Sequence, residues 1–117
     1  MFYQNMPLYL KLVYLLKEEY RIVRQLPKEY KFFLGQDIVG RTWELIDLFI
    51  IAQNSHSDGG ITDKALLVNK INQQFDCLKL RIRFLTELEL ISLNQSAALT
   101  ESTVEIGKMI GSWLKNV

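Results

Sequence analysis

The sequence predicts an all-α protein, an antiparallel up-and-down four-helix bundle built as one domain over residues 1–117. Apolar residues make up 49% of the chain, which is typical of a packed globular domain rather than a disordered one. They recur every three or four residues in four segments, and this spacing places side chains on one face of a helix. Short loops separate the segments, which favours antiparallel neighbours.

Local signals predict where the four helices begin and end, at residues 8–25, 28–52, 63–90 and 93–115, after an irregular lead. Pro7 suits a first helical turn, because its missing N–H would have no partner there. Leu26-Pro27 ends the first helix, since the residue before a proline is pushed out of the helical region. Thr62 is a good N-cap for the third helix. Ser92, with Gln95 three residues later, predicts a capping box that opens the fourth.

Four glycines fall inside the predicted helices, where each lowers helix stability. We expect Gly35 and Gly40 of the second helix to admit a neighbouring backbone, with a kink as the alternative. Gly107 and Gly111 are four residues apart and share one face of the fourth helix. We therefore expect both to be helix-contact glycines that lie against a neighbouring helix.

The third helix carries two apolar stripes on nearly opposite faces. The inner stripe consists of Val68, Ile71, Phe75, Leu78, Ile82 and Leu85. The outer stripe consists of Cys77, Leu80, Phe84, Leu88 and Ile91. A helix in a small lone domain needs one buried stripe, so a second stripe implies either a fully central helix or a partner chain. We expect the inner stripe to face the core and the outer stripe to form a homo-oligomer interface.

Three cations lie between these stripes: Lys79 and Arg83 along one flank, and Arg81 along the other. One interpretation is phosphate contact. The other is a solvated flank whose long side chains cover apolar surface. The overall charge favours neither, because 14 basic and 13 acidic residues leave a net charge of +1.

The sequence lacks the groups of residues that an enzyme needs. His56 is the only histidine, and Ser55, Ser57 and Asp58 beside it cannot form a serine triad as neighbours within one loop. There is no Glu-x-x-His pair for a di-iron site and no P-loop or dinucleotide glycine motif. Cys77 is the single cysteine, and it fits a small apolar residue better than a redox thiol. We expect no catalysis, cofactor, metal or small-molecule substrate.

The sequence also predicts a cytoplasmic protein with no membrane partner. No apolar run reaches about 18 residues, the length of a membrane span. The N-terminus lacks the basic region and cleavage site of a signal peptide. One cysteine excludes an internal disulfide and fits a reducing compartment.

Four stretches carry more information than composition does: LPKEYKFFLGQDI (26–38), WELIDL (43–48), FDCLKLRIRFLTELELIS (75–92) and EIGKMIGSWLK (105–115). In this order they resemble the Avd family, the accessory variability determinants of diversity-generating retroelements. The resemblance spans most of the chain, and IGKMIGSW is its most specific piece. The alternative is the four-helix-bundle family encoded in intervening sequences of 23S ribosomal RNA genes, which is less similar in the last helix and has a structural or unknown role.

The resemblance to Avd implies an accessory protein rather than an enzyme. Avd proteins are four-helix bundles that assemble as pentameric rings and bind the element's reverse transcriptase and template-repeat RNA. That complex makes adenine-mutagenised complementary DNA. The implied partners are therefore a homo-oligomer, a reverse transcriptase and RNA or DNA. Basic residues of the family's third helix fall at Lys79, Arg81 and Arg83, although this chain is near neutral and has Cys77 where many relatives have a lysine.

Overall fold

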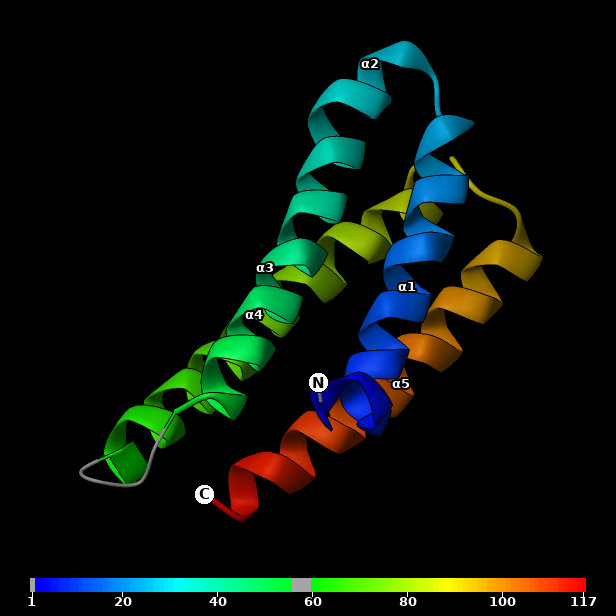
Figure 1. Cartoon of the computed structure of the whole chain (residues 1–117). Helices are drawn as coiled ribbons and strands as arrows, with labels where there is room; N and C mark the ends of the chain where they lie inside the picture. Colours follow the sequence, from blue (N-terminus) through cyan, green and yellow to red (C-terminus); the bar gives the residue numbers. More distant parts are fainter. Residues whose placement is uncertain (1, 56–59) are drawn as a thin grey trace.

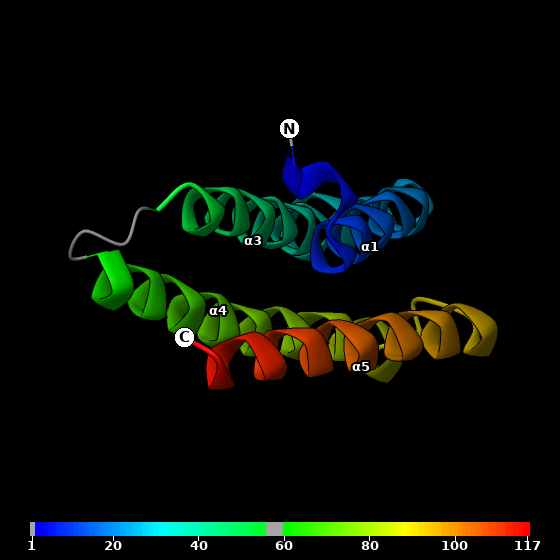
Figure 2. The ribbon, with the colours of Figure 1, turned by 60° about the horizontal axis from the view of Figure 1, so that its bottom comes forward.

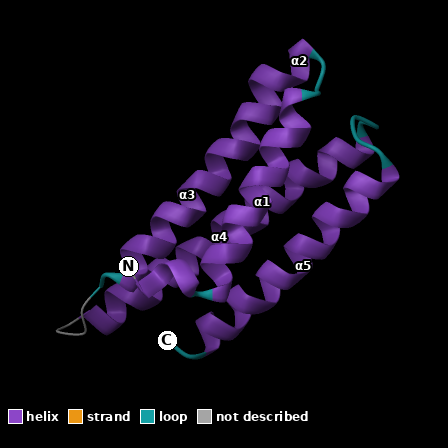
Figure 3. Ribbon diagram, turned by 45° about the vertical axis from the view of Figure 1, so that its right-hand side comes forward, coloured by secondary structure: helices purple, strands orange, loops and turns teal. Residues whose placement is uncertain are grey.

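The structure is a computed structural model that describes residues 2–55 and 60–117 (Figure 1). Over these residues it contains helices and no strands (Figure 3). In chain order the elements are the 3-10 helix η1 (Phe2–Asn5), α1 (Pro7–Arg24), α2 (Lys28–Tyr30), the π-helix η2 (Lys31–Gly35), α3 (Gln36–Gln53), α4 (Gly60–Glu87) and α5 (Leu93–Lys115). Because α2, η2 and α3 follow one another without a break, the chain forms four long helical runs, and the predicted all-α four-helix bundle is confirmed.

The four runs form two layers, with α1 and α3 in one and α4 and α5 in the other (Figure 2). Successive runs are antiparallel, so both termini lie at the same end of the bundle (Figure 1). Each long helix packs on two others: α4 on α3 and α5, and α1 on α3 and α5. The helices lie nearly lengthwise, which gives a body of 49 × 24 × 23 Å.

The predicted helix ends agree with the structure to within three residues, and the differences have local causes. The expected irregular lead contains η1 instead. The third helix begins at Gly60, so Thr62 lies inside it and is not its N-cap. This helix ends at Glu87 rather than at residue 90, because Glu89 has a left-handed backbone with φ of 57°. The Leu90 N–H then donates to the Leu85 carbonyl, which closes a Schellman-type turn without glycine.

The capping box at the start of α5 is confirmed. The Gln95 N–H donates to the Ser92 hydroxyl at 3.1 Å, and the Ser92 N–H donates to the Gln95 side chain at 2.9 Å. Two N–H groups that have no partner within the helix are thereby satisfied. This explains why the predicted range of 93–115 matches α5 at both ends.

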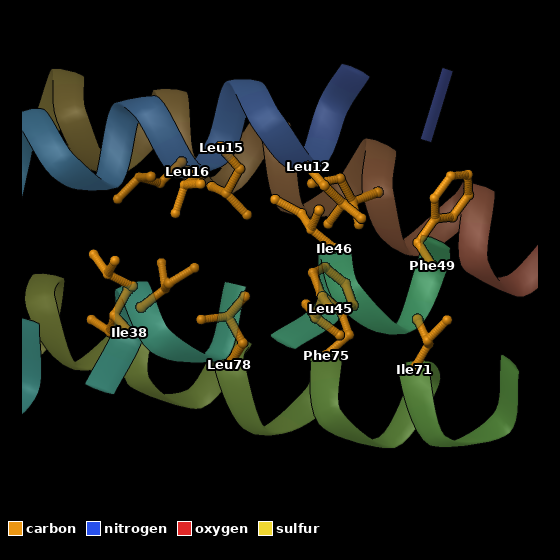
Figure 4. Packing of buried hydrophobic residues seen from close by; sticks show 14 of the residues in the cluster. Leu12, Leu15, Leu16, Ile38, Leu45, Ile46, Phe49, Ile71, Phe75 and Leu78 are labelled. Carbon is orange, nitrogen blue, oxygen red and sulfur yellow. The ribbon is translucent and has the colours of Figure 1, made fainter. Parts of the chain in front are cut away.

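The core lies between the two layers and contains the whole inner stripe of α4. Its six residues are at most 7% exposed. Figure 4 shows Phe75 and Leu78 of α4 among core residues of α3, with Leu12 and Leu15 of α1 across from them. Full burial of one such side chain contributes about 1.5–3 kcal/mol. The predicted orientation of this helix, inner stripe toward the core, is therefore confirmed.

The glycines differ in what surrounds them. A Cβ at Gly35 would lie 2.7 Å from Cγ1 of Val23 on α1, so α1 approaches closely there, through a side chain rather than the expected backbone. Gly107 lies against α4, where its Cβ would be 3.5 Å from Phe75. Gly40 and Gly111 have no heavy atom of a neighbouring element within 4 Å of such a Cβ. The close approach predicted at Gly40 and the helix contact predicted at Gly111 are therefore wrong within this chain, since no neighbouring helix lies that close to either position.

The core also contains one acidic side chain, which the sequence interpretation missed. Glu19 of α1 is 2% exposed and accepts a hydrogen bond from the Thr42 hydroxyl of α3 at 2.8 Å. Its other carboxyl oxygen, Oε1, has no hydrogen-bond partner among the described residues. Burial raises the pKa of Glu19 to about 8, and the hydrogen bond from Thr42 only partly opposes this. The carboxyl is therefore mostly neutral at pH 7.

The burial of Glu19 predicts a pH-dependent stability. Its pKa in the folded chain lies above its ordinary value, so between about pH 4.5 and about pH 8 the folded state binds more protons than the unfolded state. The free energy of unfolding should fall as pH rises through this window, by up to about 1.4 kcal/mol per pH unit from this group. Glu19→Gln, which cannot ionise, should remove the fall when urea midpoints are compared across the window. The exposed control Glu101→Gln should keep it, and an unchanged slope in Glu19→Gln would contradict the assignment.

Gly35 and Gly40 provide a matched test of the packing between α1 and the second helical run. Gly35→Ala should destabilise the protein by about 1–3 kcal/mol, because the added methyl overlaps Val23. Gly40→Ala should stabilise it by about 0.5–1 kcal/mol, because open space surrounds that position and alanine is the better helix former. Urea unfolding measures both, and Val23→Ala should rescue the first variant. Two variants that shift the midpoint equally would disprove the close approach.

Candidate partner-binding surfaces

Most of the outer stripe is exposed, as the sequence predicts for a helix with two apolar faces. Leu80, Phe84 and Leu88 are 45%, 43% and 44% exposed, and Cys77 is exposed as well. Leu66 is 62% exposed and extends the same face. It lies 18 residues before Phe84, which is five full helical turns, so the two side chains point in the same direction. The sequence interpretation missed Leu66, since it considered the outer stripe only from residue 77 onward.

The prediction that Ile91 belongs to the outer stripe is corrected by the structure. It lies beyond the end of α4, after the turn at Glu89, so the helical spacing no longer carries it onto the exposed face. Ile91 is half-buried and packs against the core instead. The exposed part of the outer stripe is therefore Cys77, Leu80, Phe84 and Leu88.

The three cations of α4 do not form one cluster. On the α3 side, Arg81 donates from Nε to the Asp37 carboxylate at 2.8 Å and from Nη1 to the Cys77 carbonyl at 3.0 Å. Arg41 donates to the same carboxylate oxygen at 3.1 Å. Partial burial raises the pKa of Asp37, but the hydrogen bonds from Arg41 and Arg81 outweigh it, so the pKa lies below its ordinary value. Arg81 thus joins α4 to α3.

Lys79 and Arg83 lie on the α5 side of α4. Lys79 forms an ion pair with Asp76 at 3.1 Å, and its Nζ lies 5.2 Å from the centre of the Phe75 ring. Arg83 is exposed. Both line a groove of about 290 Å³ between α4 and α5, together with Ile82, Thr86, Ser96, Leu99, Thr100 and Thr103. The α5 hydroxyls recur at helical spacing, so the sequence alone could have placed them on one face of α5. Only the packing of α5 on α4 shows that this face lies opposite two cations.

A second cleft, of about 470 Å³, lies at the end of the bundle that holds both termini. It is mostly apolar, and its lining includes Met6, Phe49, Met109 and Trp113, with Lys108 among its polar members. Trp113 has a ring that can either stack on a nucleic-acid base or pack against its own chain. It is half-buried and packs edge-to-face on Phe49 at 5.5 Å between ring centres, which favours packing.

Metal-binding clusters and membrane spans can be assessed over the described residues. No three histidine, cysteine or acidic side chains among them come together in a way that could hold a metal ion. No described helix has the length and apolar character needed to cross a membrane. The candidate residue His56 lies outside the described residues.

Comparison with protein families places the chain in one family. The model of the bAvd-like family matches residues 8–117, which include all four long helical runs. A search of curated proteins gave no match. Because the family model covers nearly the whole chain, from the second residue of α1 to the C-terminal residue, this protein belongs to the bAvd-like family.

Proposed function

We propose that this protein is a non-catalytic accessory subunit of a diversity-generating retroelement. In this proposal it is an oligomeric scaffold that docks the element's reverse transcriptase and helps to hold its template RNA or the complementary DNA. Membership of the bAvd-like family supports the accessory role. The polymerase chemistry belongs to the partner, and this protein contributes shape and the placement of cations.

The exposure of the outer stripe of α4 is the observation that most strongly supports the proposed oligomer. The core is complete without this stripe, because the inner stripe already fills the space between the layers. Phe84 and Leu88 leave over two-fifths of their surface in water. Covering that remainder would contribute about 1 kcal/mol for each side chain. A contiguous apolar surface of this kind is typical of protein–protein interfaces.

The proposed assembly is a ring, which the family resemblance puts at five subunits. Closure of a ring requires a heterologous contact, in which one patch meets a different patch on the next subunit. The outer stripe supplies one patch. The α4 cations Lys79 and Arg83 then remain available to nucleic acid or to acidic residues of the reverse transcriptase, whereas Arg81 is already engaged by Asp37.

The interface is tested by the mass of the protein in solution. Light scattering should give a mass well above the 13.7 kDa of one chain. Phe84→Glu should lower the mass toward one chain while helical circular dichroism persists, because a buried unpaired carboxylate opposes association. Lys17→Glu is the control, since Lys17 is an exposed polar residue of α1 and carries the new carboxylate outside the outer stripe. A monomeric wild type, or equal dissociation by both variants, would contradict the proposed interface.

The accessory role is tested by co-purification. When it is co-expressed with the reverse transcriptase encoded beside it and with the template RNA, the wild-type protein should be retained by a tagged reverse transcriptase. Retention should survive nuclease treatment if the protein contact is direct. Failure to retain the protein, or a gene neighbourhood without a reverse transcriptase, would favour the alternative of an intervening-sequence-type bundle.

A further inference from the structure

We propose that the groove between α4 and α5 binds a sugar–phosphate unit, with Lys79 and Arg83 on the phosphate and the α5 hydroxyls on phosphate or sugar oxygens. This inference rests on the nucleic-acid part of the proposed function and assigns it to one side of α4. It also excludes Arg81, which lies on the other flank of α4.

The lining of the groove fits this ligand chemistry. Its eight residues comprise two cations, four hydroxyl side chains and two apolar residues, Ile82 and Leu99, and none of them is acidic. Ile82 and Leu99 are 7% and 3% exposed, so they form a closed floor beneath the polar groups. Arginine, lysine, serine and threonine are the side chains that most often contact phosphate and sugar oxygens in nucleic-acid complexes. Hydroxyls can also accept hydrogen bonds from sugar hydroxyls.

The two cations are available for a ligand. Lys79 and Arg83 are one turn apart, a rise of about 6 Å, so both can reach one phosphate or two successive ones. The ion pair between Lys79 and Asp76 joins exposed side chains three residues apart, and such pairs contribute little. Arg83 makes no ion pair or hydrogen bond within the part of the chain that the structure describes.

The hydroxyls are held in place across the groove. Thr86 of α4 and Ser96 of α5 lie 2.8 Å apart, so one hydroxyl donates to the other and the second proton remains free for a ligand. Thr103 donates to the Thr100 carbonyl at 3.0 Å, which leaves its oxygen able to accept. These contacts restrict the rotation of three of the four hydroxyls before any ligand binds.

Arg81 cannot share this site. Its guanidinium lies on the opposite flank of α4, where Asp37 and the Cys77 carbonyl accept its hydrogen bonds. A phosphate there would have to displace a carboxylate that Arg41 also holds. The groove, of about 290 Å³, is also near the lower end of small-molecule sites, which suits one sugar–phosphate unit rather than a whole duplex.

The test compares groove variants with a matched cation variant. The probes are a single-stranded oligouridylate and uridine monophosphate, and binding is measured by fluorescence anisotropy and by calorimetry over a range of salt concentrations. Lys79→Ala/Arg83→Ala should weaken oligouridylate binding at least about tenfold and reduce the salt slope by about 1.4, because each phosphate contact on a single strand contributes about 0.7. Thr100→Val/Thr103→Val, which removes hydroxyls at constant shape, should weaken binding several-fold. Arg81→Ala should bind as the wild type does. Circular dichroism establishes that each variant is folded.

The outcomes separate the groove from the proposed function. If the wild type binds oligouridylate and Arg81→Ala loses as much affinity as the groove variants, the groove is wrong and the nucleic-acid role stands. If the wild type binds neither probe, both fail, and the oligomer is judged separately by its mass. Equal affinity for uridine monophosphate and oligouridylate, lost in the groove variants, supports the groove but contradicts a strand as its ligand.

Discussion

The burial of the inner stripe of α4 determines the position of nearly everything else in this molecule. Phe75 and Leu78 of this stripe lie in the core between the two helical layers, next to residues of α3 and across from α1 (Figure 4). A helix turns by about 100° per residue, so fixing one stripe fixes every other direction. The outer stripe must then face away from the bundle, Arg81 must face α3, and Lys79 with Arg83 must face α5. A rotation by a single residue would bring Lys79 or Arg81 toward the core, which the desolvation of a charge opposes.

In the proposed function, this arrangement gives one helix three separate roles. Its inner face stabilises the fold, its outer face offers apolar surface to another chain, and its α5 side offers cations beside hydroxyls. The roles are compatible because they use different directions around the helix. A subunit that packs on Leu80 and Phe84 would therefore leave the α4–α5 groove open to a ligand. The ion pair between Asp37 and Arg81 joins α3 to α4 on the flank of α4 that lies away from the groove.

Features with a local cause could be predicted from the sequence. The inner stripe follows from helical spacing, the start of α5 from the capping box, and the break before α2 from Pro27. The end of α4 could not be predicted, because Glu89 adopts a left-handed backbone that usually calls for glycine. The burial of Glu19 depends on Thr42, a residue 23 positions away on another helix. The groove and the open surroundings of Gly111 likewise depend on how helices pack, which spacing within one helix does not specify.

In the proposed oligomer, another copy of the chain covers the outer stripe. The single cysteine of the chain lies on this stripe and reports on it without any substitution. The measurement is the rate at which Cys77 reacts with a soluble aromatic disulfide reagent as protein concentration increases. We expect the rate to fall as the oligomer forms, and we expect Phe84→Glu to restore it to the value of an exposed thiol. A fast rate that does not depend on concentration in the wild-type protein would contradict the proposed interface.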